Sequence, residues 1–528
     1  MWRHSMPGKP FPVARFLLAW PPMDRPVHSV RARLDDFLAE LATLHYRHAA
    51  GLSTDLPVGA LYASFPELSS PDTFAAATEA LEKARSKNDT LAVRRLQLLR
   101  ELIAGQVEEA LAARDAEAIA KLEAQACLPV DDQALSFGEA LAQLPHEPHR
   151  GRRALLERAV GNFLWSERGR YGARREAALR TAERLGAKDY PRLWQDVSGI
   201  ALDKLVEAAE QTLQRTEDAY RDVLGYVLRK VEPTLRSLPG GDARRHDLQA
   251  ALRTPWMDTF FKREDLMPAV TRWLNEWNLP PAAQGRIRID DEPRPGKSRR
   301  PFVAAVRVPD EIRLVIPGEG GMDALGGLLH ESGHAQHLAH ISDTAPDELR
   351  RLGDASVTEA YAALTERLLL SHEWLKRYLR LPSTAARDAV HMSAFQALTV
   401  MRRHCAKLSY EVSLLTRGPS EERAEEYAAG QRRALLVEPH PGFFLFDVDP
   451  QLYSARYLRA WALEARLTAR LMERFNEDFW RNPSASAWLK GLFSRGGTDE
   501  AEALSTEVAG TALSLPEAGA RLVAILNG

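Results

Sequence analysis

The feature that most restricts how this chain can fold is one short segment, His330-Glu331-Ser332-Gly333-His334. On an α-helix, residues i and i+4 project from the same face, so His330 and His334 would present two imidazoles close enough to share one metal ion. Glu331, next to the first histidine, would reach a water molecule on that ion. The segment therefore calls for a helix that faces a reaction site and for a further ligand from elsewhere in the fold.

The sequence around this segment favours a helix. The preceding stretch PGEGG is a chain break and predicts a helix start near Asp323. Leu325, Leu328 and Leu329 then form an apolar group that leads into the two histidines. We therefore expect the histidine pair on a helix that is packed into the protein.

A catalytic zinc site needs a third protein ligand, and two patterns compete for it. In the metzincin pattern, H-E-x-x-H-x-x-G-x-x-H, the third ligand would be His340. The glycine of that pattern is His337 here, so the helix has no easy place to turn back toward the metal. The metzincin interpretation is therefore the weaker one.

In the second pattern the third ligand is a glutamate on another helix. Glu359 is 25 positions after His334 (359 − 334) and shares a helical stripe with small alanines, which suits a helix that approaches another one closely. Asp354, 20 positions after His334 (354 − 334), is a rival, but we expect it to cap the helix start with its carboxylate. We predict His330, His334 and Glu359 as the metal ligands.

The rest of the chain predicts a mainly α-helical protein. Residues 28–270 are repeatedly helical in pattern and show no strand-like alternation, and residues 202–231 predict one long helix that Pro233 ends. Three β-rich stretches, at residues 286–290, 302–308 and 312–316, predict a small sheet just before the metal-binding helix.

Two motifs together resemble a known family. The sequence H-E-S-G-H-A-Q-H, followed by T-E-A-Y-A-A-L-T-E, resembles the thimet oligopeptidase and oligoendopeptidase F family of zinc peptidases, which are gluzincins. That family has H-E-F-G-H-A-L-H and a glutamate with a second glutamate seven residues later, matching Glu359 and Glu366. Upstream, DEPRPGKSRRPFVAAV resembles the charged loop and edge strand that precede the family's metal helix.

A downstream segment extends the resemblance. LYSARYLRAW is similar to the family's Y-x-A-x-Y segment, whose tyrosines serve the reaction centre, and Tyr453 and Tyr457 would share a helix face at i and i+4. The family has a histidine five residues before the first tyrosine, where this chain has Val448. His440 is the nearest candidate to replace it.

The resemblance implies a two-lobed helical metallopeptidase with a deep central cleft that admits short peptides. It implies a zinc ion on the predicted ligands, Glu331 as general base, and Tyr457, assisted by Tyr453 or His440, as donor to the oxyanion. On this basis we divide the chain into an N-terminal helical domain, residues 1–270, and a catalytic zinc-peptidase domain, residues 271–528.

Three functional hypotheses follow. The first is a zinc oligoendopeptidase, which cuts internal bonds of short peptides. The second is a metallocarboxypeptidase of similar fold, which needs a basic residue to hold the free carboxylate of its substrate, and Arg456 and Arg459 lie beside the tyrosines. The third is a non-catalytic peptide-binding protein, which would have no use for Glu331.

Composition excludes other classes of partner. The net charge is −2, so the overall electrostatic field of the protein would not attract nucleic acid. We expect the arginines of residues 151–186 to form ion pairs on solvated helix faces. Two cysteines give no disulfide framework. No apolar run is long enough for a membrane span, and the N-terminus shows no export signal, so we expect a cytoplasmic protein. The sequence leaves the oligomeric state open.

Overall fold

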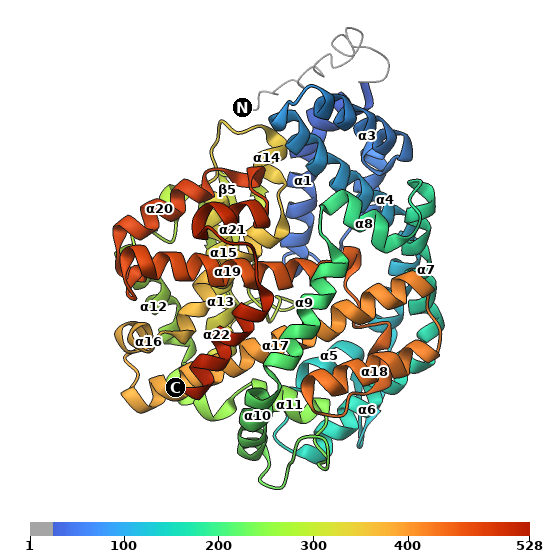
Figure 1. The fold of residues 1–528 in the computed structure, drawn as a ribbon. Helices are drawn as coiled ribbons and strands as arrows, with labels where there is room; N and C mark the ends of the chain where they lie inside the picture. Colours follow the sequence, from blue (N-terminus) through green and yellow to red (C-terminus); the bar gives the residue numbers. More distant parts are fainter. Residues whose placement is uncertain (1–24) are drawn as a thin grey trace, which may run out of the picture.

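The structure, a computed structural model, describes residues 25–528 and is mainly α-helical, as predicted (Figure 1). Before residue 280 the helices are α1 (Arg25–Ala49), α2 (Val58–Ser64), α3 (Pro71–Ser86), α4 (Thr90–Gln125), α5 (Phe137–Gln143), α6 (Arg150–Ser166), α7 (Arg168–Arg184), α8 (Tyr190–Ser198), α9 (Leu202–Arg215), α10 (Glu217–Val231), α11 (Arg245–Leu252) and α12 (Arg263–Glu276). After it they are α13 (Met322–Ala339), α14 (Asp347–Arg351), α15 (Ala355–Glu366), α16 (His372–Leu379), α17 (Ser383–Arg417), α18 (Glu422–Leu435), α19 (Tyr453–Phe475), α20 (Pro483–Phe493), α21 (Ala501–Ala509) and α22 (Leu515–Asn527).

Among these helices, none has the length and apolar character needed to cross a bilayer. The expectation about an export signal concerns residues 1–24, which lie outside the described residues.

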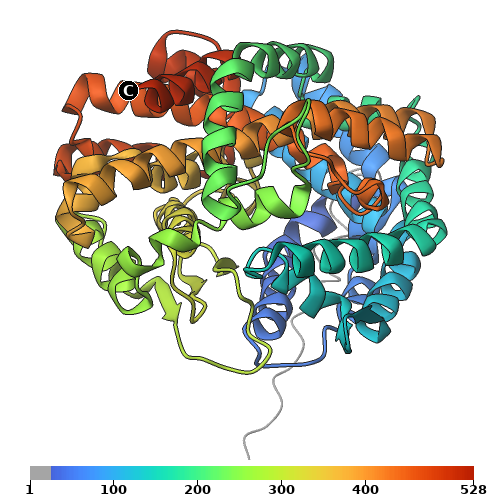
Figure 2. The same ribbon diagram turned by 90° about the horizontal axis from the view of Figure 1, so that it is seen from below.

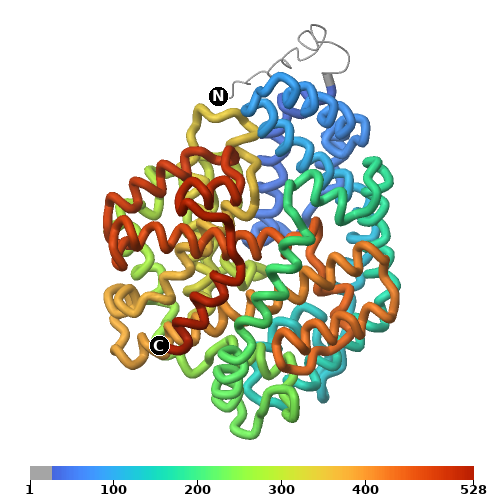
Figure 3. The backbone as a smooth tube through the Cα atoms, in the orientation of Figure 1, coloured from blue at the N-terminus to red at the C-terminus, as the bar shows by residue number. Residues whose placement is uncertain are grey.

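The helices form two groups, and the chain passes between them more than once. Helices α1 and α3–α8 lie on one side, while α12, α13, α15, α16 and α19–α21 lie on the other (Figures 1 and 3). The long helix α17 runs across, α18 lies on the first side, and the 3-10 helix Pro441–Phe444 that follows α18 packs on α6. The view from below shows the same separation of the blue and teal helices from the red ones (Figure 2).

Packing follows this arrangement and not the order of the sequence. One apolar cluster joins residues between Ile119 and Tyr171 to residues between Tyr410 and Val448. The largest cluster contains residues from both sides of position 270; for example, Tyr220 of α10 stacks on Phe395 of α17 with ring centroids 5.5 Å apart. The division into residues 1–270 and 271–528 stays a prediction, and the core is continuous across it.

A three-stranded sheet lies beside the helix that carries the histidine pair. Its strands are β3 (Ile287–Asp290), β4 (Phe302–Arg307) and β5 (Glu311–Val315), in the order β3-β5-β4, with β3 parallel and β4 antiparallel to β5. Ile287, Ile312 and Leu314 pack in one cluster with Ala335 and Ala339 of α13. The predicted strands and their place next to this helix are confirmed.

Two expectations for the N-terminal half are wrong. A hairpin of β1 (Cys127–Val130) and β2 (Gln133–Ser136) interrupts the helical region, and Asp131 takes the left-handed conformation in its turn (φ 52°). Four-residue strands are too short for a period of two to stand out. The predicted long helix is two helices, α9 and α10, separated at Thr216, whose hydroxyl donates to the carbonyl of Thr212 at 2.7 Å.

Helices α13 and α15 approach each other unusually closely. A Cβ atom on Gly333 of α13 would lie 2.8 Å from Cα of Ala362 and 2.9 Å from the carbonyl oxygen of Tyr361, both on α15. The hydroxyl of Thr365 donates to the carbonyl of Leu329 at 2.7 Å and ties the two helices together. A glycine is therefore required at position 333 of the histidine-bearing segment.

We expect Gly333→Ala to push these helices apart and to lower the free energy of unfolding by about 1–3 kcal/mol, because the added atom meets backbone. Gly491→Ala, on α20, is the matched control: its Cβ would meet nothing within 4 Å, so it should leave Tm unchanged or raise it slightly. Thermal unfolding of both variants checks this, and an equal Tm for the two would contradict it.

Candidate functional site

Helices α13 and α15 bring the three predicted metal ligands together. His330 and His334 lie one turn apart on α13, with ring centroids 4.8 Å apart. Oε2 of Glu359, on α15, lies 3.4 Å from Nε2 of His330 and 3.7 Å from Nε2 of His334. Each residue offers one ligand atom, and these atoms all lie within 4.8 Å of one another.

A second set of contacts orients these side chains. Nδ1 of His330 lies 3.1 Å from Oε2 of Glu366, and Nδ1 of His334 lies 3.2 Å from the hydroxyl of Thr358. The hydroxyl of Tyr453 donates to Oε1 of Glu359 at 2.9 Å. When Nδ1 of each histidine donates outward, the lone pair of Nε2 points to the centre, as a metal requires.

The charges of the site favour a cation. Burial alone would raise the pKa of the Glu359 carboxyl, but His330 and His334 hold that pKa well below its usual range. Burial alone would lower the pKa of His330, but contacts with Glu359 and Glu366 raise it to about 10. Oε2 of Glu359 is buried without a hydrogen-bond partner. Two imidazoles and an ionised carboxylate, with one orphaned oxygen, fit a divalent cation such as zinc.

Glu331 lies beside this group and under the edge strand of the sheet. Strand β4 packs on α13, and the backbone of Val303 lies near the Glu331 carboxylate. Burial raises the pKa of the Glu331 carboxyl, and the charges of His334 and His330 oppose that shift only in part. A carboxylate with a raised pKa next to a metal-binding group has the chemistry of a general base.

The two predicted tyrosines share a face of α19, as expected, but their hydroxyls differ. Tyr453 is engaged with Glu359, as described above. Tyr457 stacks on Trp461 with ring centroids 5.9 Å apart, and its hydroxyl has no hydrogen-bond partner among residues 25–528. The charges that act on the pKa of Tyr457 include those of Glu359 and Glu331, so this hydroxyl lies close to the centre.

His440 does not join these residues. Its Nδ1 accepts a hydrogen bond from the backbone of Gly442 at 3.1 Å, and its ring fits against Gly161 of α6, where an added Cβ would lie 2.3 Å from Nδ1. Burial lowers the pKa of His440, and the charges that act on it are those of Glu157 and Arg158 on α6 and of Arg244 and Arg245 at the start of α11. The segment after α18 packs on α6, so the structure gives the proposed assisting role of His440 no support.

The rival ligands are also engaged elsewhere. Nδ1 of His340 lies 2.8 Å from the carbonyl oxygen of Gln336, at the end of α13. Asp354 caps α15 and accepts from the backbone of Ser356 at 2.9 Å, as predicted. Burial lowers the pKa of His337 to about 3, and its Nδ1 lies 3.1 Å from the hydroxyl of Thr358, so it packs behind His334 as a neutral ring.

Arg456 and Arg459, the candidate carboxylate-binding residues, are buried in ion pairs. Arg456 pairs with Glu101 of α4. Arg459 pairs with Asp354 at 2.9 Å and also with Glu502 of α21. Both guanidinium groups therefore fasten α19 to other helices and are not free to hold a substrate carboxylate.

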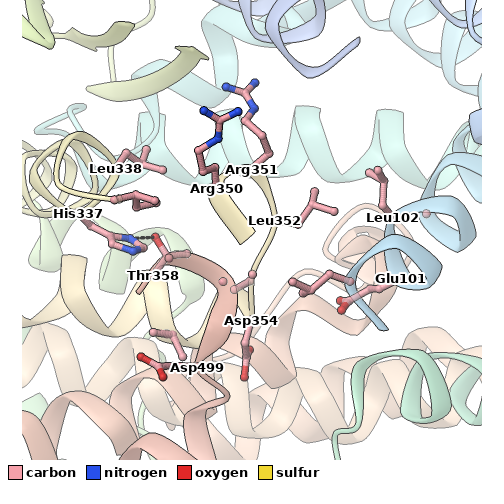
Figure 4. A pocket seen from close by; sticks show the side chains of 18 of the residues that line it. Glu101, Leu102, His337, Leu338, Arg350, Arg351, Leu352, Asp354, Thr358 and Asp499 are labelled. Carbon is pink, nitrogen blue, oxygen red and sulfur yellow. Dashed lines mark hydrogen bonds between the residues drawn. The ribbon is translucent and has the colours of Figure 1, made fainter. Parts of the chain in front are cut away.

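A cavity of about 340 Å³ lies behind the histidine pair, between α4, the end of α13 and the segment from α14 to α15 (Figure 4). His337 and Thr358 line it, whereas His330, Glu331 and Glu359 do not. Its charged residues are paired: Glu101 with Arg456, Arg350 with Asp347, Arg351 with Asp35, Asp354 with Arg459, and Asp499 with Arg495. This cavity reaches the outer contacts of His334 and is separate from the ligand atoms.

Sequence reasoning missed two contributors to the site. Thr358 directly precedes Glu359, which places it about 100° further around the same helix, toward His334. His404 packs edge-on against Tyr457 with centroids 5.4 Å apart, although it is 53 positions away (457 − 404). The first could have been inferred from helix geometry, whereas the second depends on how α17 crosses α19.

Comparisons with known proteins identify the fold. The solved structure described as "PZ peptidase A with inhibitor 2" superposes with a TM-score of 0.68 over 100% of this chain and 98% of that chain, at 13% sequence identity. No family model matches the sequence, and no curated protein matches it. The chain therefore shares the helical fold of PZ peptidase A along its whole length.

We expect Arg459→Met to lower the free energy of unfolding by about 3–5 kcal/mol, because Asp354 would remain buried without its partner. Arg470→Met, on the same helix, is the control: its pair with Glu473 is exposed, so the loss should stay within about 0.5 kcal/mol. Denaturant unfolding measures both. A stable Arg459→Met variant would return this arginine to the list of substrate-binding candidates.

Proposed function

We propose that this protein is a zinc-dependent peptidase that hydrolyses internal bonds of short peptides. The observation that supports it is the convergence of His330, His334 and Glu359 on one point, within a fold shared with a peptidase. Three nitrogen and oxygen ligands that leave a fourth position open are the pattern of catalytic zinc. A bound zinc ion would polarise the scissile carbonyl and acidify water.

Glu331 is the proposed general base. It lies next to His330 on the face that meets β4, and burial raises the pKa of its carboxyl, so that it can take a proton from water and pass it to the leaving amine. Strand β4 packs beside it, with the backbone of Val303 near the carboxylate.

Tyr457 is the proposed donor to the oxyanion. Its hydroxyl is without a partner among residues 25–528, whereas the hydroxyl of Tyr453 is committed to Glu359. Trp461 and His404 pack against the ring of Tyr457 and fix its direction. A donor held in place before the reaction stabilises developing charge most effectively.

Arg456 and Arg459 are engaged in ion pairs and cannot hold a terminal carboxylate, so a carboxypeptidase would need another basic residue, such as Arg300, whose charge acts on the pKa of Tyr457. We further propose a cytoplasmic location with short peptides as substrates and neither nucleic acid nor membrane as partner. The separate free thiols of Cys127 and Cys405 agree with a reducing compartment.

The test is a cleavage assay with quenched fluorescent peptides before and after removal of zinc by a chelator, with the cut sites mapped by mass spectrometry. Internal cuts that disappear with zinc and return with it support the proposal. Glu331→Gln should keep zinc and lose turnover by several orders of magnitude. Cuts at the C-terminus alone would favour the carboxypeptidase, and zinc-loaded protein that binds peptides without cutting them would favour the third hypothesis.

Glu359→Gln should weaken zinc retention and abolish activity, because the site loses its anionic ligand. His340→Ala is the control and should leave both nearly intact, since its ring contacts the backbone of Gln336. Metal analysis after dialysis, with the rise in Tm on zinc addition, measures retention. The opposite result would move the site to the metzincin pattern.

Tyr457→Phe should reduce kcat by roughly a hundredfold or more, with little change in KM or zinc content, because it removes a donor needed only as charge develops. Tyr453→Phe should instead weaken zinc retention, since it frees Oε1 of Glu359. Steady-state kinetics with metal analysis separate the two effects. An unchanged kcat in Tyr457→Phe would show that Tyr457 is not the oxyanion donor.

A further inference from the structure

A small cavity opens directly beside the candidate metal centre. It has a volume of about 140 Å³ and lies between α13, α17, α19 and the short 3-10 helix Arg367–Leu370. His330 and Tyr457 form part of its wall. Because one of these is a proposed metal ligand and the other the proposed oxyanion donor, a side chain that enters the cavity lies beside the reaction centre.

Five of the nine remaining wall residues are apolar, and the other four are polar: Glu366, Arg367, Ser393 and Gln396. Leu369 and Leu370 come from the 3-10 helix, Ala397 and Val400 from α17, and Trp461 from α19. Val400 is 39% exposed, which places it where solvent reaches the cavity. Ala397 is buried, and its small side chain leaves room that a larger residue would fill.

The polar residues of the wall mostly have partners already. Arg367 lies 3.5 Å from Glu366 and 3.9 Å from Glu464, and the amide of Gln396 donates to the carbonyl of Leu252. The hydroxyl of Ser393 is buried without a partner, and its oxygen is closed off from solvent. The charged groups of the wall are therefore already paired with groups of opposite charge.

Its size matches one large side chain. A dry cavity of about 150 Å³ is known to hold a molecule of benzene. A cavity of about 140 Å³ thus suits leucine, phenylalanine or tyrosine, and it is far too small for a folded segment.

We propose that this cavity is the subsite for the residue next to the scissile bond and that it selects a large apolar or aromatic side chain. The inference rests on the proposed peptidase function. It assigns Ala397 and Val400 as specificity-determining residues, and their contacts with one substrate side chain set the preference.

The first experiment uses the zinc-loaded full chain and a peptide series in which one residue beside the scissile bond is varied. Leucine, phenylalanine and tyrosine should exceed alanine, aspartate and lysine by roughly tenfold or more in kcat/KM. Binding of the same peptides to the Glu331→Gln variant gives the preference without turnover. A preference in binding without cleavage by the parent chain would overturn the proposed function and keep the subsite; equal values for all side chains would overturn the subsite.

The second experiment changes the cavity itself. Val400→Glu should raise kcat/KM for lysine at this position several-fold relative to phenylalanine, a gain that a folding defect would not produce. Ala397→Leu should shift the preference from phenylalanine toward alanine. Met472→Glu, at an equally exposed apolar residue on another surface, is the control and should change neither. An unchanged preference in both cavity variants would show that another surface binds this substrate side chain, and it would overturn the proposal.

Discussion

The close contact between α13 and α15 is the constraint on which the rest of the site depends. A metal ion needs ligands within a few ångström of one another, and two helices can supply them only where their backbones nearly touch. Gly333 on one helix and Ala362 and Ala363 on the other remove the side chains that would hold them apart. The hydrogen bond from Thr365 to Leu329 then fixes the position of α15 along the axis of α13, so that Glu359 faces the two histidines.

Around this contact, buried charged residues form two kinds of pair: some create the cation site, and others anchor the helices. Glu359 and Glu366 face His330 and create a place for a cation, whereas Asp354, at the start of the same helix, is neutralised by Arg459. The arginines of α19 anchor that helix to α4, α15 and α21, and this anchoring is what aims Tyr453 and Tyr457 at the centre. Burial makes these pairs costly to break, so the position of α19 is firmly determined.

The sequence alone could predict those features that are determined by residues close together along the chain. The helix with His330 and His334, the small sheet before it and the cap at Asp354 are set by neighbours along the chain, and all three are confirmed. Glu359 needed only the assumption of a second, closely packed helix.

His440 was misplaced because its neighbours come from α6, some 280 positions earlier (440 − 161 = 279), and no local pattern encodes that contact. The arginines of residues 151–186 show the same limit: Arg153 pairs with Asp247 and Arg175 donates to the backbone of Leu445, although local spacing had pointed to partners on their own helices.

The return of α18 to the first group of helices has a consequence for how the chain is made. Apolar residues between Ile119 and Tyr171 complete their cluster only with residues between Tyr410 and Val448, which follow 239 positions later (410 − 171). At the usual rate of synthesis this interval lasts roughly 10–50 s, during which Phe137, Leu156 and Leu164 lack their final neighbours. The nascent N-terminal half therefore carries an incomplete apolar surface until the residues between Tyr410 and Val448 have been synthesised.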